Sequence, residues 1–228
     1  MKMRKFLNII SILLLIQTAG LTFARNIPHF SDADGNIFAF QPMTSTPRPT
    51  LLFLDCNGAR EEDIDTSRFI YDSLKWNIAV CGSSRNHRDP RLNETDILVL
   101  VHRLYSYSAV DRQKIVLFGF SGQGAQALGT YLRHPQYFAG IVTECAHPGL
   151  IYNPDFKDVE GKPVILITRE QEWNRGWNEM MAQIFSDRGM NVKLIMTPGE
   201  HHIGDAEELY NACKIIDSLF KENTIPHF

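Results

Sequence analysis

The 228-residue sequence predicts a single α/β domain, in which a mostly parallel sheet is covered by helices on both faces. Two observations predict this fold. Short, continuous apolar runs rich in Val, Ile and Leu recur along the chain, and such runs suit strands that are buried on both faces. Segments with helical periodicity separate these runs, as parallel strands require. The length suffices for one well-buried core and is short for two.

The expected elements follow a turn-rich segment that ends near residue 48. The expected strands are Asn36–Gln41, Thr50–Leu54, Trp76–Val80, Lys114–Phe118, Phe138–Val142, Pro163–Thr168 and Asn191–Met196. The expected helices are Asp63–Leu74, Glu94–Leu104, Gln123–Arg133, Trp177–Arg188 and Ala206–Lys221. This regular alternation predicts the parallel sheet.

The first 24 residues differ in kind from the rest. Three basic residues precede the apolar run Phe6–Ile16, and Thr22–Ala24 ends in the small-x-small pattern that signal peptidases cleave. We therefore expect a signal peptide over residues 1–24 and a single domain over residues 25–228, exported to the periplasm or secreted. The alternative is an uncleaved anchor, because Leu21–Phe23 extends the apolar stretch toward the ~20 residues of a membrane span. We expect no stable span in the mature chain.

Charge and cysteine spacing exclude several classes of partner. A formal net charge of -3 offers no basic surface for nucleic acid. The four cysteines follow no CxxC or Cys/His spacing typical of metal sites. They lie in or beside apolar segments, which is typical of buried thiols.

The strongest chemical signal is a serine at a sharp turn between a strand and a helix. The strand Lys114–Phe118 runs into Gly119–Gly124, and a helical pattern follows at once. Such a turn places Ser121 at the carboxyl edge of the sheet, where open α/β sheets bind ligands. A glycine-rich turn that only connects, or that binds phosphate at the helix N-terminus, is the alternative. However, no Lys-Ser/Thr pair follows, as a phosphate loop would need.

Val116–Gly122, followed by a helix of small residues, resembles the nucleophile elbow of the α/β-hydrolases. The stretch Leu132–Val142 is similar to the helix-to-strand passage that follows the elbow in compact bacterial esterases. The resemblance extends from Thr50 to the last helix and implies an α/β-hydrolase fold with Ser121 as the nucleophile. The sequence departs from the G-x-S-x-G pattern at its fifth position, where Gln123 replaces glycine. A long side chain there must point away or shift the turn.

The resemblance also implies a base, because the fold carries Ser, acid and His in that chain order. Two histidines, His201 and His202, follow the last expected strand. Reading the family's Gly-x-x-His from Gly199 favours His202 as the base, and His201 stays the alternative.

The acid is expected after the strand Pro163–Thr168. Related enzymes carry Gly-x-x-Asp there, and aligning Arg169 with that glycine puts Glu172 in the place of the acid. Glu170 is the alternative. The alternative for both residues is that they are charged loop residues exposed to solvent, without a catalytic role.

The oxyanion hole should be built from two backbone amides. One is that of Gly122, after the nucleophile, and by position the other is that of Asn57, or of Cys56. In this fold the strands that end at Leu54 and Val80 are neighbours, so Cys56 and Cys81 could meet as a disulfide that braces the loop.

The sequence thus predicts a carboxylic ester hydrolase that acts through an acyl-enzyme, without metal or organic cofactor. Only residues 143–162 are available for a cap between two strands, so the resemblance implies an open, lidless site for small or extended esters. Trp173 and Trp177 could form an apolar wall for an acyl group, or belong to the core. A serine peptidase or amidase with the same triad, and a non-catalytic binding protein on this scaffold, are the alternatives. The oligomeric state is left open.

Overall fold

The computed structural model describes residues 29–31, 37–41 and 46–222. The expected signal peptide over residues 1–24 lies outside these residues, and so does the boundary at residue 25. Across the described part of the chain, no helix combines the length and the apolar character needed to span a membrane.

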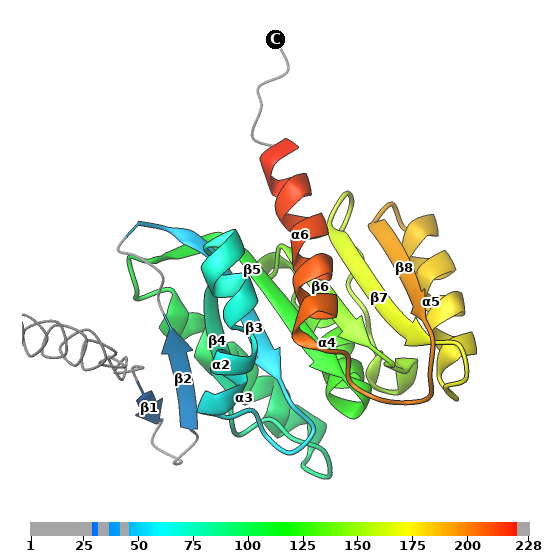
Figure 1. Cartoon of the computed structure of the whole chain (residues 1–228), viewed down its shortest axis with the longest axis horizontal. Helices are drawn as coiled ribbons and strands as arrows, with labels where there is room; N and C mark the ends of the chain where they lie inside the picture. The colour runs from blue at the N-terminus through cyan, green and yellow to red at the C-terminus, as the bar shows by residue number, and fades with distance from the viewer. Residues whose placement is uncertain (1–28, 32–36, 42–45, 223–228) are drawn as a thin grey trace, which may run out of the picture.

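An eight-stranded sheet forms the centre of the molecule (Figure 1). The strands are β1 (His29–Ser31), β2 (Ile37–Gln41), β3 (Arg48–Leu54), β4 (Asn77–Cys81), β5 (Val110–Phe120), β6 (Gly140–Glu144), β7 (Pro163–Arg169) and β8 (Asn191–Thr197). Their order is β1-β2-β4-β3-β5-β6-β7-β8. The six strands from β4 to β8 pair in parallel, whereas β1 and β2 pair antiparallel at one edge. The predicted mostly parallel sheet is confirmed.

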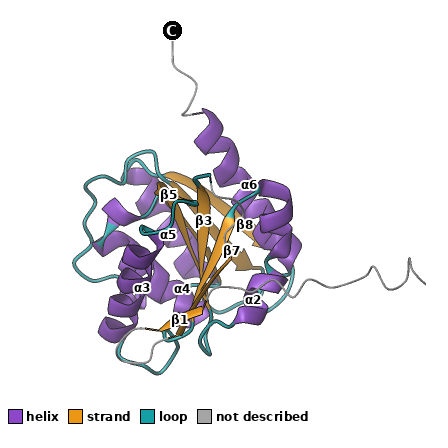
Figure 2. Ribbon diagram, turned by 90° about the vertical axis from the view of Figure 1, so that its left-hand side faces the viewer, coloured by secondary structure: helices purple, strands orange, loops and turns teal. Residues whose placement is uncertain are grey.

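Helices cover both faces of this sheet, as the edge-on view of Figure 2 shows. They are α2 (Glu61–Thr66), α3 (Pro90–Leu104), α4 (Ser121–Arg133), α5 (Arg175–Asp187) and α6 (Ala206–Glu222), with the short turns η1 (Ile70–Leu74), η2 (Pro135–Tyr137) and η3 (Pro148–Leu150). The first face carries α2, η1 and α6, and the second carries α3, α4 and α5. Between β6 and β7 only η3 is helical, so the described residues contain no cap domain.

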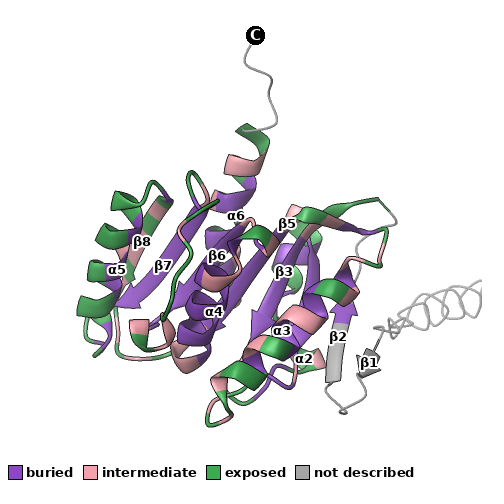
Figure 3. Cartoon of the chain, turned by 180° about the vertical axis from the view of Figure 1, so that it is seen from behind, coloured by how far each residue is buried: buried purple, intermediate pink, exposed green. Residues whose placement is uncertain are grey.

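Two apolar cores lie on the two faces of the sheet, and Figure 3 shows the buried strands between the helices. Alternate residues of one strand serve different cores, because successive side chains of a strand point to opposite faces. On β3, Leu52 and Leu54 pack in the core with α3 and α4, while Leu51 and Phe53 pack in the core with α2 and α6. This double burial explains the continuous apolar runs in the sequence.

The expected helix Asp63–Leu74 is wrong in one respect, because the structure divides it into α2 and the π-helical turn η1. Ile64 and Ile70 are both buried on the same side of the sheet. Six residues apart, they would point in different directions on one straight α-helix. The break turns both toward the core. A further difference is the short strand β1, which has no apolar run to signal it.

Candidate active site

The parallel register brings the carboxyl ends of five strands to one edge of the sheet. Leu54 pairs with Gly119, and Phe120 pairs with Glu144. On the far side Arg169 pairs with Thr197. The turns that follow β3, β5, β6, β7 and β8 therefore meet at this edge, and the expected site residues lie on them.

Ser121 begins α4 directly after β5, with a left-handed backbone (φ +51°) that a non-glycine residue rarely adopts. Such strain typically persists at functional sites, where the surroundings hold it. The turn is tight, because a Cβ placed on Gly119 would lie 2.4 Å from the Gln123 carbonyl oxygen. Gly119 is therefore required for Ser121 to sit at the turn, as a nucleophile elbow demands.

The structure places His201, and not His202, against the serine. His201 Nε2 lies 2.8 Å from Ser121 Oγ. The exposed His202 instead bonds through Nδ1 to the Glu200 carbonyl oxygen at 2.8 Å. The preference for His202 is therefore corrected. Gly199 has φ +114°, and the turn that it makes places the His202 ring against Gly199. Counting Gly-x-x-His along the chain therefore selects His202, whereas the imidazole that faces the serine is that of His201.

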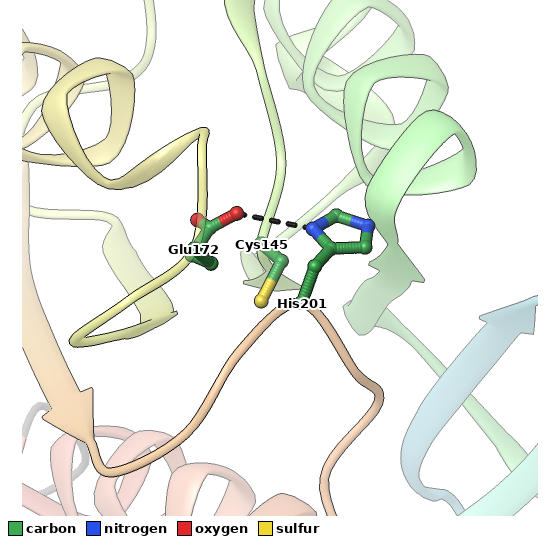
Figure 4. A group of neighbouring side chains, drawn as sticks. All are labelled: Cys145, Glu172 and His201. Carbon is green, nitrogen blue, oxygen red and sulfur yellow. Dashed lines mark hydrogen bonds and ion pairs between the residues drawn. The ribbon is translucent and has the colours of Figure 1, made fainter.

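Glu172 completes a continuous chain of contacts. Its Oε2 lies 3.0 Å from His201 Nδ1, and Figure 4 shows the carboxylate directed at the imidazole. The buried carboxylate also accepts hydrogen bonds from the Thr168 hydroxyl (2.7 Å) and from the Asn174 backbone N–H (2.9 Å). These donors fix its orientation, as a group that orients a base requires.

The alternative acid, Glu170, does not share this position. It is exposed, and its backbone N–H donates to the Thr197 carbonyl oxygen at 3.0 Å. Of the two carboxylates considered from the sequence, Glu172 is therefore the one that the structure brings to the imidazole.

Two aromatic rings flank the His201 imidazole. The Trp173 indole stacks on it, with ring centroids 4.0 Å apart and an interplanar angle of 19°. Phe120 lies at 5.0 Å with a tilted ring. These contacts hold the imidazole in place between the serine and the acid.

The two candidate oxyanion donors beside Gly122 differ in their partners. The N–H of Asn57 donates to Asp55 Oδ1 at 2.8 Å, in a local turn closed by an aspartate side chain. It is therefore engaged within its own loop, and the preference for Asn57 is corrected. The N–H of Cys56 has no acceptor among residues 46–222. Gly122, in the first turn of α4, has an N–H with no partner inside the helix. Cys56 and Gly122 are therefore the candidate donors whose backbone N–H groups have no partner of this kind.

All four cysteines lie within the described residues, and all are free. The Cys56 thiol donates to the Phe120 carbonyl oxygen at 3.3 Å, and Cys81 lies near the Ser83 hydroxyl at 3.7 Å. The Cys56–Cys81 disulfide is thus absent from the structure, and the thiol of Cys56 instead joins the oxyanion loop to the nucleophile turn.

The departure at Gln123 is accommodated by a buried polar network that the sequence did not indicate. Gln123 Oε1 accepts a hydrogen bond from the Ser84 hydroxyl at 2.7 Å, and its Nε2 lies 3.5 Å from Asn86 Oδ1. The backbone N–H of Asn86 donates to the Cys56 carbonyl oxygen at 2.9 Å. The side chain of Asn86 also fills the space beside the Gly122 Cα. Through Asn86, the loop after β4 therefore contacts both the turn that carries Cys56 and the turn that carries Gly122.

Cys145, Glu172 and His201 offer ligand atoms within 4.8 Å of one another, which raises the question of a metal (Figure 4). Burial raises the pKa of the Cys145 thiol to about 12, and this thiol donates toward the His202 carbonyl oxygen at 3.8 Å. Both imidazole nitrogens already face Ser121 and Glu172. The cluster therefore fits a triad better than a metal site.

A buried ionic cluster lies beneath the loop that carries His201. Glu144 Oε2 accepts a hydrogen bond from the Gly204 N–H at 2.7 Å and lies 3.8 Å from Arg169 Nη2. The Arg169 guanidinium also donates to Glu208 Oε1 and to Thr197 Oγ1, both at 2.6 Å. Burial raises the pKa of Glu144 to about 7. The cluster holds the loop before His201 through Thr197 and after it through Gly204 and Glu208. No sequence motif indicated this cluster.

His147 follows β6 and caps the turn η3 at the same edge of the sheet. Its Nδ1 accepts a hydrogen bond from the Gly149 N–H at 3.1 Å. Burial, and secondly the nearby His201, lowers its pKa. It therefore stays neutral beside the site.

The strand order and the turn at Ser121 define the α/β-hydrolase fold. The sequence matches no family model and no curated protein. Among solved structures, the chain resembles a carboxylesterase from Mesorhizobium loti (TM-score 0.67, 15% identity, covering 86% of this chain and 99% of that one). It also resembles an esterase from Pyrobaculum calidifontis (TM-score 0.66, 16% identity, 94% and 91%).

A third similar structure is an acylaminoacyl peptidase from Pyrococcus horikoshii (TM-score 0.63, 14% identity). That match covers 89% of this chain and 42% of the peptidase, so this chain spans less than half of its length. The neighbours thus include both esterases and a peptidase. At these identities the similarity shows the fold.

Proposed function

We propose that this protein is a serine hydrolase that cleaves carboxylic esters through an acyl-enzyme. One observation carries the proposal: Ser121, His201 and Glu172 form a continuous chain with contacts of 2.8 and 3.0 Å. A serine hydroxyl is a weak nucleophile unless a base removes its proton and a third group orients that base. These three side chains come from the turns after β5, β7 and β8, which is the arrangement typical of the fold.

In the proposed mechanism, His201 Nε2 accepts the Ser121 proton while Oγ attacks the ester carbonyl carbon. The Glu172 carboxylate accepts a hydrogen bond from Nδ1–H and stabilises the imidazolium that forms. The amides of Cys56 and Gly122 donate to the new oxyanion, and removing one such donor typically costs ~3 kcal/mol. Nε2–H then protonates the departing alkoxide. Water, deprotonated by the same nitrogen, hydrolyses the acyl-enzyme and restores Ser121.

Ester substrates are favoured by the open edge of the sheet. The segment between β6 and β7 forms only the turn η3 over the site edge, so small or extended esters can approach. An amide could approach as well, and amidase activity is the alternative outcome. The contacts between the three side chains argue against a binding protein without catalysis, since such a protein needs no oriented base.

The experiment that tests the proposal is stoichiometric labelling of the purified protein by a small fluorophosphonate, followed by mass spectrometry. We expect one label on Ser121, none in Ser121→Ala, and a 10²–10⁴-fold slower reaction in His201→Ala. His202→Ala is the matched control and should react at the wild-type rate. A folded wild-type protein that takes no label would contradict the proposal. Slow labelling in His202→Ala and not in His201→Ala would reverse the assignment of the base.

Turnover then distinguishes the ester from the amide. We expect hydrolysis of short-chain esters with much slower cleavage of the matching anilides. Faster cleavage of anilides would favour the amidase alternative.

We also propose that the chain acts after export, on the basis of the signal-like pattern that ends at Ala24. Intact mass of the protein recovered from the periplasm or medium tests this, with an N-terminus at Arg25 as the expected result. An uncleaved chain in the membrane fraction would support the anchor instead.

A further inference from the structure

The Trp173 indole is held against the His201 imidazole, but most of the residue is exposed to solvent. It follows Glu172 directly, and its indole stacks on the His201 imidazole at 4.0 Å. Yet 73% of the residue is exposed, whereas Trp76 is fully buried in the core. A large exposed aromatic ring that is held beside reactive groups marks a binding surface more often than a packing residue.

A second exposed tryptophan lies on the helix that follows Trp173. Trp177 lies on the first turn of α5, four residues after Trp173, and is 49% exposed. Trp173 lies just before α5, whose N-cap is Asn174, and the Asn178 backbone N–H donates to the Asn174 carbonyl oxygen at 3.0 Å. Both tryptophans thus leave an exposed aromatic surface on the segment that follows Glu172. No cap covers it in the described residues.

The mechanism decides which part of an ester reaches this surface. The carbonyl oxygen must point to the amides of Cys56 and Gly122, on the turns after β3 and β5. The leaving oxygen must lie within hydrogen-bond reach, ~3 Å, of His201 Nε2 in order to receive its proton. Because Trp173 stacks on that same imidazole, the group attached to the leaving oxygen is the part of the ester nearest the indole.

We propose that Trp173 and Trp177 form a subsite for the leaving group, and that this subsite takes planar or apolar alcohols, aryl alcohols above all. This inference rests on the proposed ester hydrolysis and names its substrate class. It differs from the expectation that these tryptophans contact an acyl group. The chemistry balances: the carbonyl C–O bond breaks, its electron pair stays on the leaving oxygen, and the Nε2 proton converts that oxygen to the free alcohol.

The proposal is tested with three esters that separate the two ends of the substrate. Ethyl acetate and 2-naphthyl acetate differ only in the alcohol, and 2-naphthyl butanoate differs from 2-naphthyl acetate only in the acyl group. We expect Trp173→Ala to lower kcat/KM for both naphthyl esters about tenfold more than for ethyl acetate, and Trp173→Phe to restore most of that loss. Phe69→Ala is the control, because Phe69 is an exposed aromatic residue (57%) that packs against Tyr210 in another part of the molecule.

Three results would overturn the inference. An equal loss on all three esters would mean that Trp173 acts only through His201. A loss that follows acyl length would mean that the tryptophans contact the acyl group, and unchanged kinetics would mean that Trp173 contacts neither end of the ester. A second measurement is inhibition by 2-naphthol, whose inhibition constant should rise in Trp173→Ala. Labelling by a small fluorophosphonate separates the failure of the subsite from the failure of the proposed hydrolase function. Trp173→Ala should still be labelled. A wild-type protein that is not labelled would mean that the proposed function itself is wrong.

Discussion

The Ser84 hydroxyl donates a 2.7 Å hydrogen bond to Gln123 Oε1, and both side chains are buried behind the nucleophile turn. Gln123 occupies the position where the family motif carries its last glycine. Its amide reaches Asn86, whose backbone is bonded to the carbonyl of Cys56. The replacement of glycine therefore introduces a connection between the serine turn and the oxyanion loop.

The first prediction is that Gln123→Gly, which gives the G-x-S-x-G pattern, lowers both the proposed esterase activity and the stability of the protein. The change leaves the Ser84 hydroxyl buried without its acceptor, which costs about 1–3 kcal/mol of stability. It also releases Asn86, so we expect kcat for ester hydrolysis to fall about tenfold with little change in KM. Steady-state kinetics and urea denaturation measure the two effects. Ser84→Ala should show the same pattern more weakly, and a Gln123→Gly protein as active and stable as the wild type would refute this role.

The second prediction concerns the acid. Glu172→Gln keeps the shape of the side chain but removes the charge that stabilises the imidazolium, so kcat should fall 10²–10⁴-fold. Glu170→Gln is the matched control two residues away, and it should keep wild-type activity because Glu170 is exposed. The reverse pattern would transfer the role to Glu170. Ester turnover at saturating substrate measures both.

The third prediction is a thiol count. Because all four cysteines are free, the unfolded protein should react with four equivalents of a thiol reagent without prior reduction. Cys56→Ser should keep most of the activity, since the residue contributes its backbone N–H and a serine hydroxyl can still donate to the Phe120 carbonyl. A count of two in the wild type and of three in Cys56→Ser would establish the Cys56–Cys81 disulfide.

The fourth prediction follows from the raised pKa of Glu144. A carboxyl group whose pKa is about 7 when folded and near 4.5 when unfolded holds its proton longer in the folded state. Stability therefore declines as the pH rises from about 4.5 to about 7, by at most about 3 kcal/mol. Glu144→Gln should remove this decline, so its stability relative to the wild type should rise over that range. Urea unfolding at pH 5 and pH 8 tests this, and a constant difference between the two proteins would rule it out.

The sequence predicted the strands well because parallel strands buried on both faces leave continuous apolar runs. Six of the seven expected strands lie within the parallel part of the sheet, at nearly the expected positions. The position of Ser121 also followed from the pattern, since it comes directly after a strand, whereas Glu172 was placed by the resemblance to enzymes that carry Gly-x-x-Asp after the strand that ends at Arg169. Their catalytic roles stay predictions until the labelling experiment is done.

Two of the errors at the site concern loops in which one backbone angle or one local hydrogen bond decides the position of a side chain or the partner of an amide. The left-handed Gly199 determines which of His201 and His202 faces the serine. The Asp55 carboxylate captures the N–H of Asn57, and an aspartate two residues before a candidate donor is a signal that could have indicated this turn. The network around Gln123 joins residues about 40 positions apart, which no local pattern reveals.

The proposed triad combines residues from turns that are 51 and 29 residues apart in the chain (172 − 121 and 201 − 172). No fragment of the sequence contains more than one of these turns without a whole strand and helix between them. Reaction of Ser121 with a covalent inhibitor therefore depends on the part of the sheet from β5 to β8 being formed. In a partly aggregated or misfolded preparation, titration with such an inhibitor would count the native molecules. After dilution from urea, the return of inhibitor-reactive Ser121 would report refolding.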